Sequence, residues 1–250
     1  MMKQIIVIVK KDLKETLRTR AFYFSIVVVL FFMVMLGSVV RGQIDSSIEQ
    51  GLTPGEVIPV IQPLMGTILF TLSLLVMMLF CLYVSAYTLT MEKIKHSLES
   101  LLCTPLSLRQ IWLGKSLAVF LPSAILGLLF AFAAIAGMNQ LFIVPQIGQS
   151  VTPGAAPLVA TLVAAPLIIF FLVTLLIALQ LIITNIRWIN IAFMGLIFGV
   201  GFGLSPFLRI GSASWNIVFI SLVVAAILAL VTMYLSRLVT KEKIVLSSKG

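Results

Sequence analysis

The sequence predicts an all-α integral membrane protein, a single domain with six transmembrane helices. The 250-residue chain is 61% hydrophobic and only 10% charged, whereas a soluble domain carries roughly 25% charged residues. Its apolar residues form runs of about 20 residues, the length of helix that crosses a bilayer. The charged residues gather in short segments between these runs, and residues 116–186 contain no Asp, Glu, Lys or Arg.

Polar and turn-forming residues divide the apolar sequence into six runs. Residues 41–62 are predicted to form a polar, mildly acidic loop, and residues 139–156 a loop rich in Gln, Pro and Gly. Pro63 suits the first turn of a helix, whereas Pro166 lies inside a run and predicts a kink. The predicted spans are residues 21–40, 63–90, 116–138, 157–183, 189–204 and 215–236.

The N-terminal residues 3–20 predict an amphipathic helix that lies in the membrane interface. Apolar residues recur on one side at three- or four-residue spacing, and basic residues occupy the other side. The basic residues of this interfacial helix include Lys10, Lys14 and Arg18. A plain cytosolic cap that fixes topology by its charge is the simpler alternative, and the two interpretations are compatible.

The distribution of Lys and Arg predicts that both termini lie in the cytoplasm. With the N-terminus inside, the inner segments contain fifteen of the 17 basic residues, and the outer loops contain only Arg41 and Arg209. Basic residues accumulate on the cytoplasmic side of membrane proteins. We therefore expect a multi-pass protein of the cell membrane with residues 91–115 in the cytoplasm.

The remaining composition argues against several other functions. The net charge of +9 comes from residues that flank apolar runs, which indicates membrane topology and not nucleic-acid binding. Cys81 and Cys103 lie in different environments, so no disulfide is expected, and the only histidine, His96, has no partner for a metal site. We predict no catalytic, cofactor-binding or metal-binding residue in this chain.

The segment between the second and third predicted spans reads MEKIKHSLESLLCTPLSLRQIWLGKS from Met91 to Ser116. Leu98, Leu101 and Leu102 share one helical face, and Thr104-Pro105 ends that helix, so the segment predicts a short amphipathic helix and a proline turn. Ser107 is a plausible N-cap for a helix that re-enters the membrane. A mere linker, polar for solubility, is the simpler alternative.

This segment resembles the cytoplasmic-loop signature of type-2 ABC exporter permeases. The matching residues are Glu92-Lys93, Ser97-Leu98-Glu99, Leu101-Leu102, Thr104-Pro105-Leu106-Ser107 and Gly114-Lys115. Two departures are visible: Lys95-His96 stands where the family favours an acidic or Arg residue before Gly, and Ser97 replaces Thr. The basic N-terminal helix and the six predicted spans extend the resemblance over the whole chain.

The resemblance implies a permease subunit that dimerises and forms a translocation pathway at the dimer interface. Two separate ATPase subunits would hold the ATP and Mg, and a coupling helix in the 91–115 loop would dock on them. The residues implied in this interface are Glu92, Leu98, Glu99, Leu101, Leu102, Thr104, Pro105 and Leu106. The second permease subunit would be the same chain or a different one.

Gly114-Lys115-Ser116 looks like the end of a phosphate-binding loop, but that motif needs a glycine where this chain has Arg109. We expect Lys115 to snorkel at the membrane surface and the chain itself to hydrolyse no ATP. A non-transporting membrane scaffold that anchors a cytosolic partner is the rival function. An ion-coupled carrier is a weaker rival, because no ionisable residue lies within a predicted span.

Other polar and small residues within the spans have two interpretations each. Gly195, Gly199 and Gly203 are spaced for close helix packing, or reflect ordinary glycine enrichment in membrane helices. Thr161, Thr174 and Gln180 would bond across helices or face a pathway. A pathway lined by uncharged spans would suit apolar or amphipathic cargo such as lipids, drugs or peptides.

Overall fold

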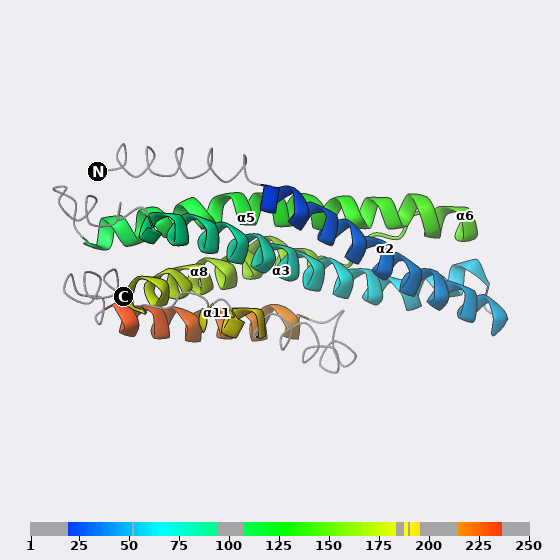
Figure 1. Ribbon diagram of the computed structural model, residues 1–250. Helices are drawn as coiled ribbons and strands as arrows, with labels where there is room; N and C mark the ends of the chain where they lie inside the picture. The colour runs from blue at the N-terminus through cyan, green and yellow to red at the C-terminus, as the bar shows by residue number, and fades with distance from the viewer. Residues whose placement is uncertain are drawn as a thin grey trace.

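The computed structural model describes residues 20–51, 53–94, 108–183, 188–189, 191–195 and 215–236. Every regular element in these ranges is a helix (Figure 1), which confirms the predicted all-α class. Four of these helical stretches are long and apolar enough to cross a membrane: Gly55–Ser85, Gln110–Ile147, Ala155–Ile182 and Asn216–Leu235. The protein is therefore a membrane protein with at least this many candidate spans, and the total of six stays a prediction.

The helices follow one another in simple order along the chain. Two long helices come first, and a third continues through a π-helical turn, η1, into the short helix α6. A second π-helical turn, η2, joins α7 to α8. The bounds are α2 Arg20–Glu49, α3 Pro54–Ile94, α5 Leu108–Met138, η1 Asn139–Ile143, α6 Val144–Ile147, α7 Ala155–Val159, η2 Ala160–Ala164, α8 Ala165–Ile182 and α11 Asn216–Ser236.

The predicted loop at residues 41–62 is wrong, because α2 continues through Glu49 and α3 already begins at Pro54. Gly51 ends α2 with a left-handed φ of 81°. The carboxylate of Glu56 accepts hydrogen bonds of 2.8 Å from the backbone N–H and the hydroxyl of Thr53, as in a capping box. Pro63 consequently lies inside α3 and not in its first turn.

The predicted loop at residues 139–156 is also too long, because the helix that begins at Leu108 continues through η1 and α6 to Ile147. Gly148, with a φ of 79°, ends α6, and its N–H donates to the carbonyl of Val144. Only residues 148–154 connect α6 to α7. The helical stretches 155–182 and 216–236 begin and end within two residues of the predicted fourth and sixth spans.

Pro166 follows the π-helical turn η2 near the start of α8. A proline has no N–H, so the carbonyl of Leu162 lacks its ordinary helical donor. The wider turn of η2 directly precedes this gap, and the N–H of Ala165 donates to the carbonyl of Ala160. Helices at membrane depth tolerate proline where such local adjustments re-satisfy the backbone.

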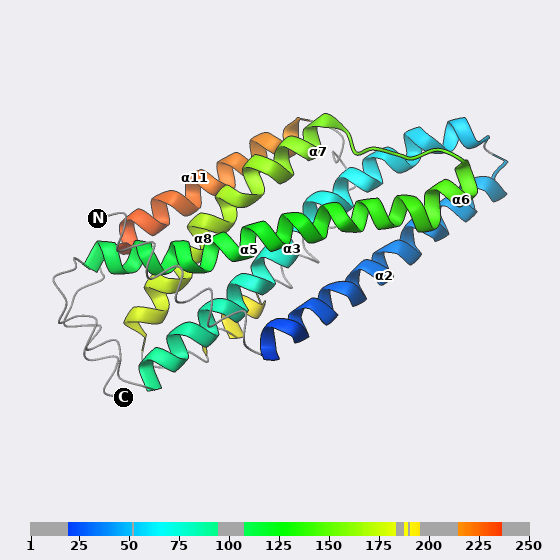
Figure 2. The same cartoon turned by 90° about the horizontal axis from the view of Figure 1, so that it is seen from above.

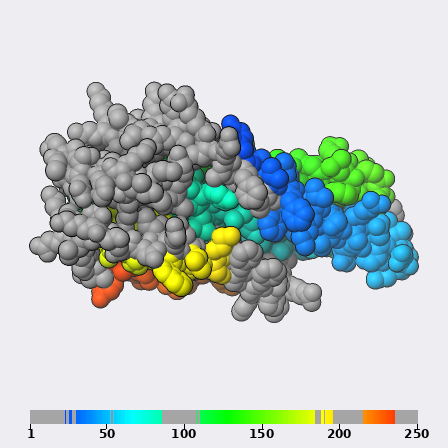
Figure 3. Space-filling view, in the orientation of Figure 1, coloured from blue at the N-terminus to red at the C-terminus, as the bar shows by residue number. Residues whose placement is uncertain are grey.

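Part of the bundle projects well beyond α7 and α11. Figure 2 shows the α2–α3 connection and α6 reaching past these two helices, and the 148–154 loop running back from α6 to α7. With 41 residues, α3 is about 60 Å long, roughly twice the 30 Å hydrocarbon core of a bilayer. We call the projecting part (residues 40–65 and 134–151) the helical extension; it lies at the right of Figure 3, blue to cyan and green.

Two apolar clusters hold the described helices together. The larger one joins α3, α5, α8 and α11 and includes Met77, Leu176 and Ile177, all with no exposed surface. The second includes Ile61 and Met65 of the helical extension and continues along α3 to Phe80. Large apolar side chains on the outer face of α11, such as Phe219 and Leu230, are more than 60% exposed, as expected for a helix that faces lipid or another membrane protein.

The contact between α3 and α5 depends on a glycine. A Cβ added to Gly127 would clash with the Met77 side chain and come within 3.2 Å of the Met77 backbone nitrogen. Backbones that approach this closely need a small residue at the crossing. Gly66 has the same role between α3 and α7, because its Cβ would lie 2.6 Å from Cγ of Pro157.

We expect Gly127→Ala to destabilise the protein by about 1–3 kcal/mol, the usual effect of overpacking a tight contact. The measurement is the thermal unfolding midpoint of the detergent-solubilised chain. Gly137→Ala on the same helix is the matched control, because a Cβ there meets nothing within 4 Å. Equal midpoints for the two variants would show that α3 and α5 are not held this closely.

The predicted topology can be tested with single cysteines in a chain that lacks Cys81 and Cys103. Cysteines at Gln50 and Gln149, both exposed at the ends of the helical extension, should react with an impermeant thiol reagent in intact cells. A cysteine at Ser247 should react only after permeabilisation. Labelling of the Ser247 site in intact cells would contradict the orientation that we predict from the basic residues.

Candidate functional site

Most residues of the predicted ATPase interface lie outside the described part of the chain. Glu92 belongs to the last turn of α3, which ends at Ile94. The other predicted contacts, from Leu98 to Leu106, fall in the range 95–107 and stay predictions. Lys10, Lys14 and Arg18 of the predicted interfacial helix and Gly199 and Gly203 of the fifth span also lie outside the described residues.

The helices on both sides of this segment are described. α3 carries the first residues of the signature in its last turn, and α5 carries Gly114 and Lys115 near its start. α3 and α5 pack against each other, and Figure 2 shows that they cross, with the end of α3 and the start of α5 apart. Any movement of residues 95–107 would therefore act on two helices that are already in contact.

Lys115 is not the snorkelling side chain that the sequence suggested. It is only 4% exposed, and its neighbour Ser116 is fully buried. The Ser116 hydroxyl donates a 2.9 Å hydrogen bond to the carbonyl of Trp112. The first turns of α5 are thus covered by protein and do not lie free at the membrane surface.

A set of polar contacts joins α5, α8 and α11 close to the start of α5. The indole N–H of Trp112 donates to the carbonyl of Thr174 at 2.9 Å. The Thr174 hydroxyl donates to the carbonyl of Phe171 at 2.8 Å. The hydroxyl of Thr232 in α11 donates to that same carbonyl at 3.3 Å and to the carbonyl of Leu228 at 2.6 Å. We call these four residues, Trp112, Phe171, Thr174 and Thr232, the inner node.

The polar residues of the predicted fourth span are buried in the bundle. The hydroxyls of Thr161 and Thr174 donate to carbonyls of their own helical stretch, Pro157 and Phe171. Gln180 is fully buried in α8. Two described bonds across helices are made to backbone carbonyls of α8, those of Thr174 and Phe171, which sequence reasoning did not identify as partners.

In the helical extension, Asn139 fixes the loop between α6 and α7. Its side-chain NH₂ donates to the carbonyls of Ile135 and Val151 at 3.1 Å, and its side-chain oxygen accepts the N–H of Val151 at 2.9 Å. The amide thus pairs with both backbone groups of Val151, as a neighbouring strand would. Asn139 is 9% exposed, so these bonds are largely sheltered from water.

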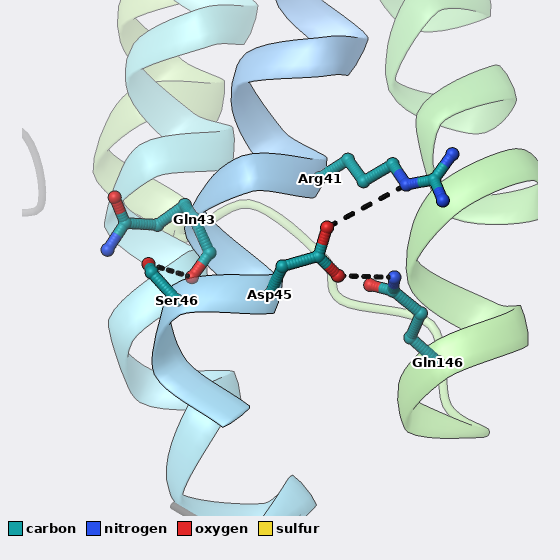
Figure 4. A network of polar contacts seen from close by, with 5 residues as sticks. All are labelled: Arg41, Gln43, Asp45, Ser46 and Gln146. Atoms are coloured by element: carbon teal, nitrogen blue, oxygen red, sulfur yellow. Dashed lines mark hydrogen bonds and ion pairs between the residues drawn. The ribbon is translucent and has the colours of Figure 1, made fainter. Parts of the chain in front are cut away.

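A second polar contact joins α2 to α6 at the surface of the helical extension (Figure 4). The side-chain NH₂ of Gln146 donates to the carboxylate of Asp45 at 2.8 Å. Arg41, one turn earlier in α2, lies 3.8 Å from the other oxygen of this carboxylate. Both charged side chains are about half exposed or more, so the ion pair itself contributes little to stability.

A pocket of about 240 Å³ lies where the helical extension meets the start of α7. It is lined by Pro59, Gln62, Pro63, Gly154 and Pro157. The α3 residues of the lining share one helical face because they are three or four positions apart. No sequence motif pointed to this pocket.

Within the described ranges, no group of three His, Cys, Asp or Glu residues is arranged to hold a metal ion. Gly195, the one described member of the glycine series, has nothing within 4 Å of a Cβ added to it. It makes no close packing contact with the described helices, and close helix packing by the glycine series as a whole stays a prediction.

Comparisons with protein-family models, with curated proteins and with solved structures each gave no match. The functional proposal therefore depends on the residues of this chain and on their arrangement.

We expect Asn139→Ala to free the 148–154 loop from α5. The variant leaves the buried N–H and carbonyl of Val151 without their partner, which costs about 1–3 kcal/mol for a buried group. Hydrogen exchange of the Val151 amide should become faster, and the unfolding midpoint should fall. Gln140→Ala, at the exposed neighbouring position, is the control and should change neither the exchange rate of the Val151 amide nor the unfolding midpoint. Unchanged exchange in both variants would show that the Asn139 hydrogen bonds do not hold the loop.

Proposed function

We propose that this chain is the membrane-spanning permease subunit of an ATP-driven ABC exporter, acting as a dimer with separate ATPase subunits. The observation that carries the proposal is the signature between Glu92 and Lys115, whose first and last residues belong to two long membrane helices. The likeness of this signature to type-2 exporter permeases is a likeness of sequence. The all-helical membrane fold is compatible with it.

The described contacts supply a route for mechanical coupling. In the proposed mechanism, closure of the ATPases displaces the segment that joins α3 to α5. The contact between Gly127 and Met77 keeps these helices together, so they would move as a pair. The inner node would then pass the movement from Trp112 to α8 and from Phe171 to Thr232 in α11.

The membrane-spanning helices also limit the cargo. The helical stretches Ala155–Ile182 and Asn216–Leu235 contain no charged residue. A charged group in the middle of a bilayer is expensive unless it finds a partner. We therefore propose an apolar or amphipathic cargo, and a dimer interface as its path, because one thin bundle does not enclose a wide route.

Substitutions in the proposed coupling helix should separate insertion from coupling. Glu99→Ala and Leu102→Asp lie outside every span, so the chain should insert and fold normally. Interface anchors are typically worth about 2 kcal/mol or more, which corresponds to roughly 30-fold weaker capture of the ATPase. The measurements are co-purification of the partner ATPase and the ATP hydrolysis that accompanies transport.

Ser100→Ala is the control, because it alters a polar neighbour of both residues without adding charge or removing an apolar anchor. If Glu99→Ala and Leu102→Asp both retain the ATPase and transport normally, the segment is a linker only. If another cytosolic protein co-purifies with the chain and no ATPase is present, that result would favour the membrane scaffold.

A further inference from the structure

The pocket at the start of α7 lies near one end of the candidate span in α11, where we expect a membrane surface. α7 packs against α11, and the start of α11 lies beside α7 in Figure 2. Trp215, directly before α11, is 56% exposed, and exposed tryptophans at helix ends are typical of the membrane–water interface. A ligand in this pocket would have its polar end at the level of lipid headgroups and an apolar end free to reach the bilayer.

Proline rings make up the apolar part of the pocket lining. The ring of Pro157 packs directly on Gly66, where a Cβ would come within 2.6 Å of its Cγ atom. This contact holds the Pro157 ring against α3. Three proline rings form much of the lining, and their fixed backbone angles keep the walls in place without a ligand.

The polar character of the pocket is that of a hydrogen-bond acceptor. The carbonyl of Pro59 points along α3 toward position 63, where a helical N–H would normally donate to it. Position 63 is a proline, so this donor is missing. The Pro59 carbonyl therefore lacks its ordinary α-helical donor, in the same stretch of α3 that carries the exposed amide of Gln62.

The charge around the pocket favours a cation. None of the five lining residues is charged. In the described part of the helical extension, three carboxylates, those of Asp45, Glu49 and Glu56, accompany one guanidinium, that of Arg41. The surrounding field is therefore negative, and it raises the local concentration of positively charged ligands.

We propose that this pocket binds the protonated amine head of an amphiphile. The ammonium N–H groups donate to the Pro59 carbonyl and the Gln62 amide oxygen, the proline rings cover its first methylenes, and the remaining chain extends into the bilayer. A lipid with a primary amine headgroup and a free alkylamine share this chemistry. The site needs only the described fold, so it does not depend on the chain being an exporter.

The test uses the purified full-length chain in nanodiscs of phosphatidylcholine, whose quaternary headgroup has no N–H to donate. A photoreactive dodecylamine and a photoreactive dodecanol are compared, and labelled peptides are mapped by mass spectrometry. The amine should label residues 54–66 or 148–160 saturably, at about ten-fold lower concentration than the alcohol, because a charge-assisted hydrogen bond is lost in the alcohol. Equal labelling by both probes would overturn the proposal.

Two variants probe the pocket itself. Gly154→Leu should fill it, since Gly154 has an ordinary extended backbone and a Cβ there would meet only Pro157 Cδ at 3.7 Å. Gly42→Leu is the control, because a Cβ at this exposed position meets nothing within 4 Å. Saturable amine labelling should disappear in the first and persist in the second, and its persistence in Gly154→Leu would contradict the site.

Pro63→Ala supplies the missing N–H to the Pro59 carbonyl and should weaken amine labelling more than alcohol labelling, which loses only contact with the Pro63 ring. A parallel loss of both would mean that the carbonyl is not the acceptor. The source of the ligand is then distinguished by competition. Protection by phosphatidylethanolamine in the nanodisc identifies a lipid headgroup, and protection by unlabelled dodecylamine alone identifies a free amine; protection by neither would overturn the proposal.

Discussion

The fold depends on the contact between α3 and α5. α3 is the element against which α2, α5, α7 and α8 all pack, and at Met77 it lies close to the α5 backbone at Gly127. In lipid, where the hydrophobic effect does not drive helices together, such close packing supplies much of the association energy. The inner node lies toward one end of this helix pair and the Asn139 contacts toward the other, so both ends of the bundle are positioned by the same crossing.

The sequence alone predicted the membrane class, the helical content and the apolar stretches, because hydropathy and backbone hydrogen bonding leave few alternatives in a bilayer. It misplaced the ends of helices at residues 41–62 and 139–156, because polar residues on a helix that leaves the bilayer resemble a loop in composition. The Thr53-x-x-Glu56 pattern is a capping-box motif, and it could have indicated from the sequence where α3 begins. No comparable sequence motif predicted that the Asn139 side chain hydrogen-bonds to the backbone of Val151, twelve residues later.

The candidate site was predictable to different degrees. The signature around Glu92 to Lys115 is a local pattern, and it could be recognised from the sequence. The pocket joins residues of α3 to residues about 95 positions later, so it emerges only from packing. Pro59 and Pro63, which would ordinarily argue against a helix interior, are tolerated in the second and third turns of α3. The missing donor that weakens the helix there is also the source of the proposed acceptor in the pocket.

The charge of the α2–α3 hairpin bears on how the chain enters the membrane. Its described tip carries Arg41 together with Asp45, Glu49 and Glu56, a net charge of −2. During biosynthesis this tip crosses the bilayer in the predicted orientation. A membrane potential that is negative inside drives negative charge outward with about 2.3 kcal/mol per charge per 100 mV. The electrical gradient would therefore assist translocation of the hairpin, and dissipating it would slow insertion of the first two helices before any partner subunit is met.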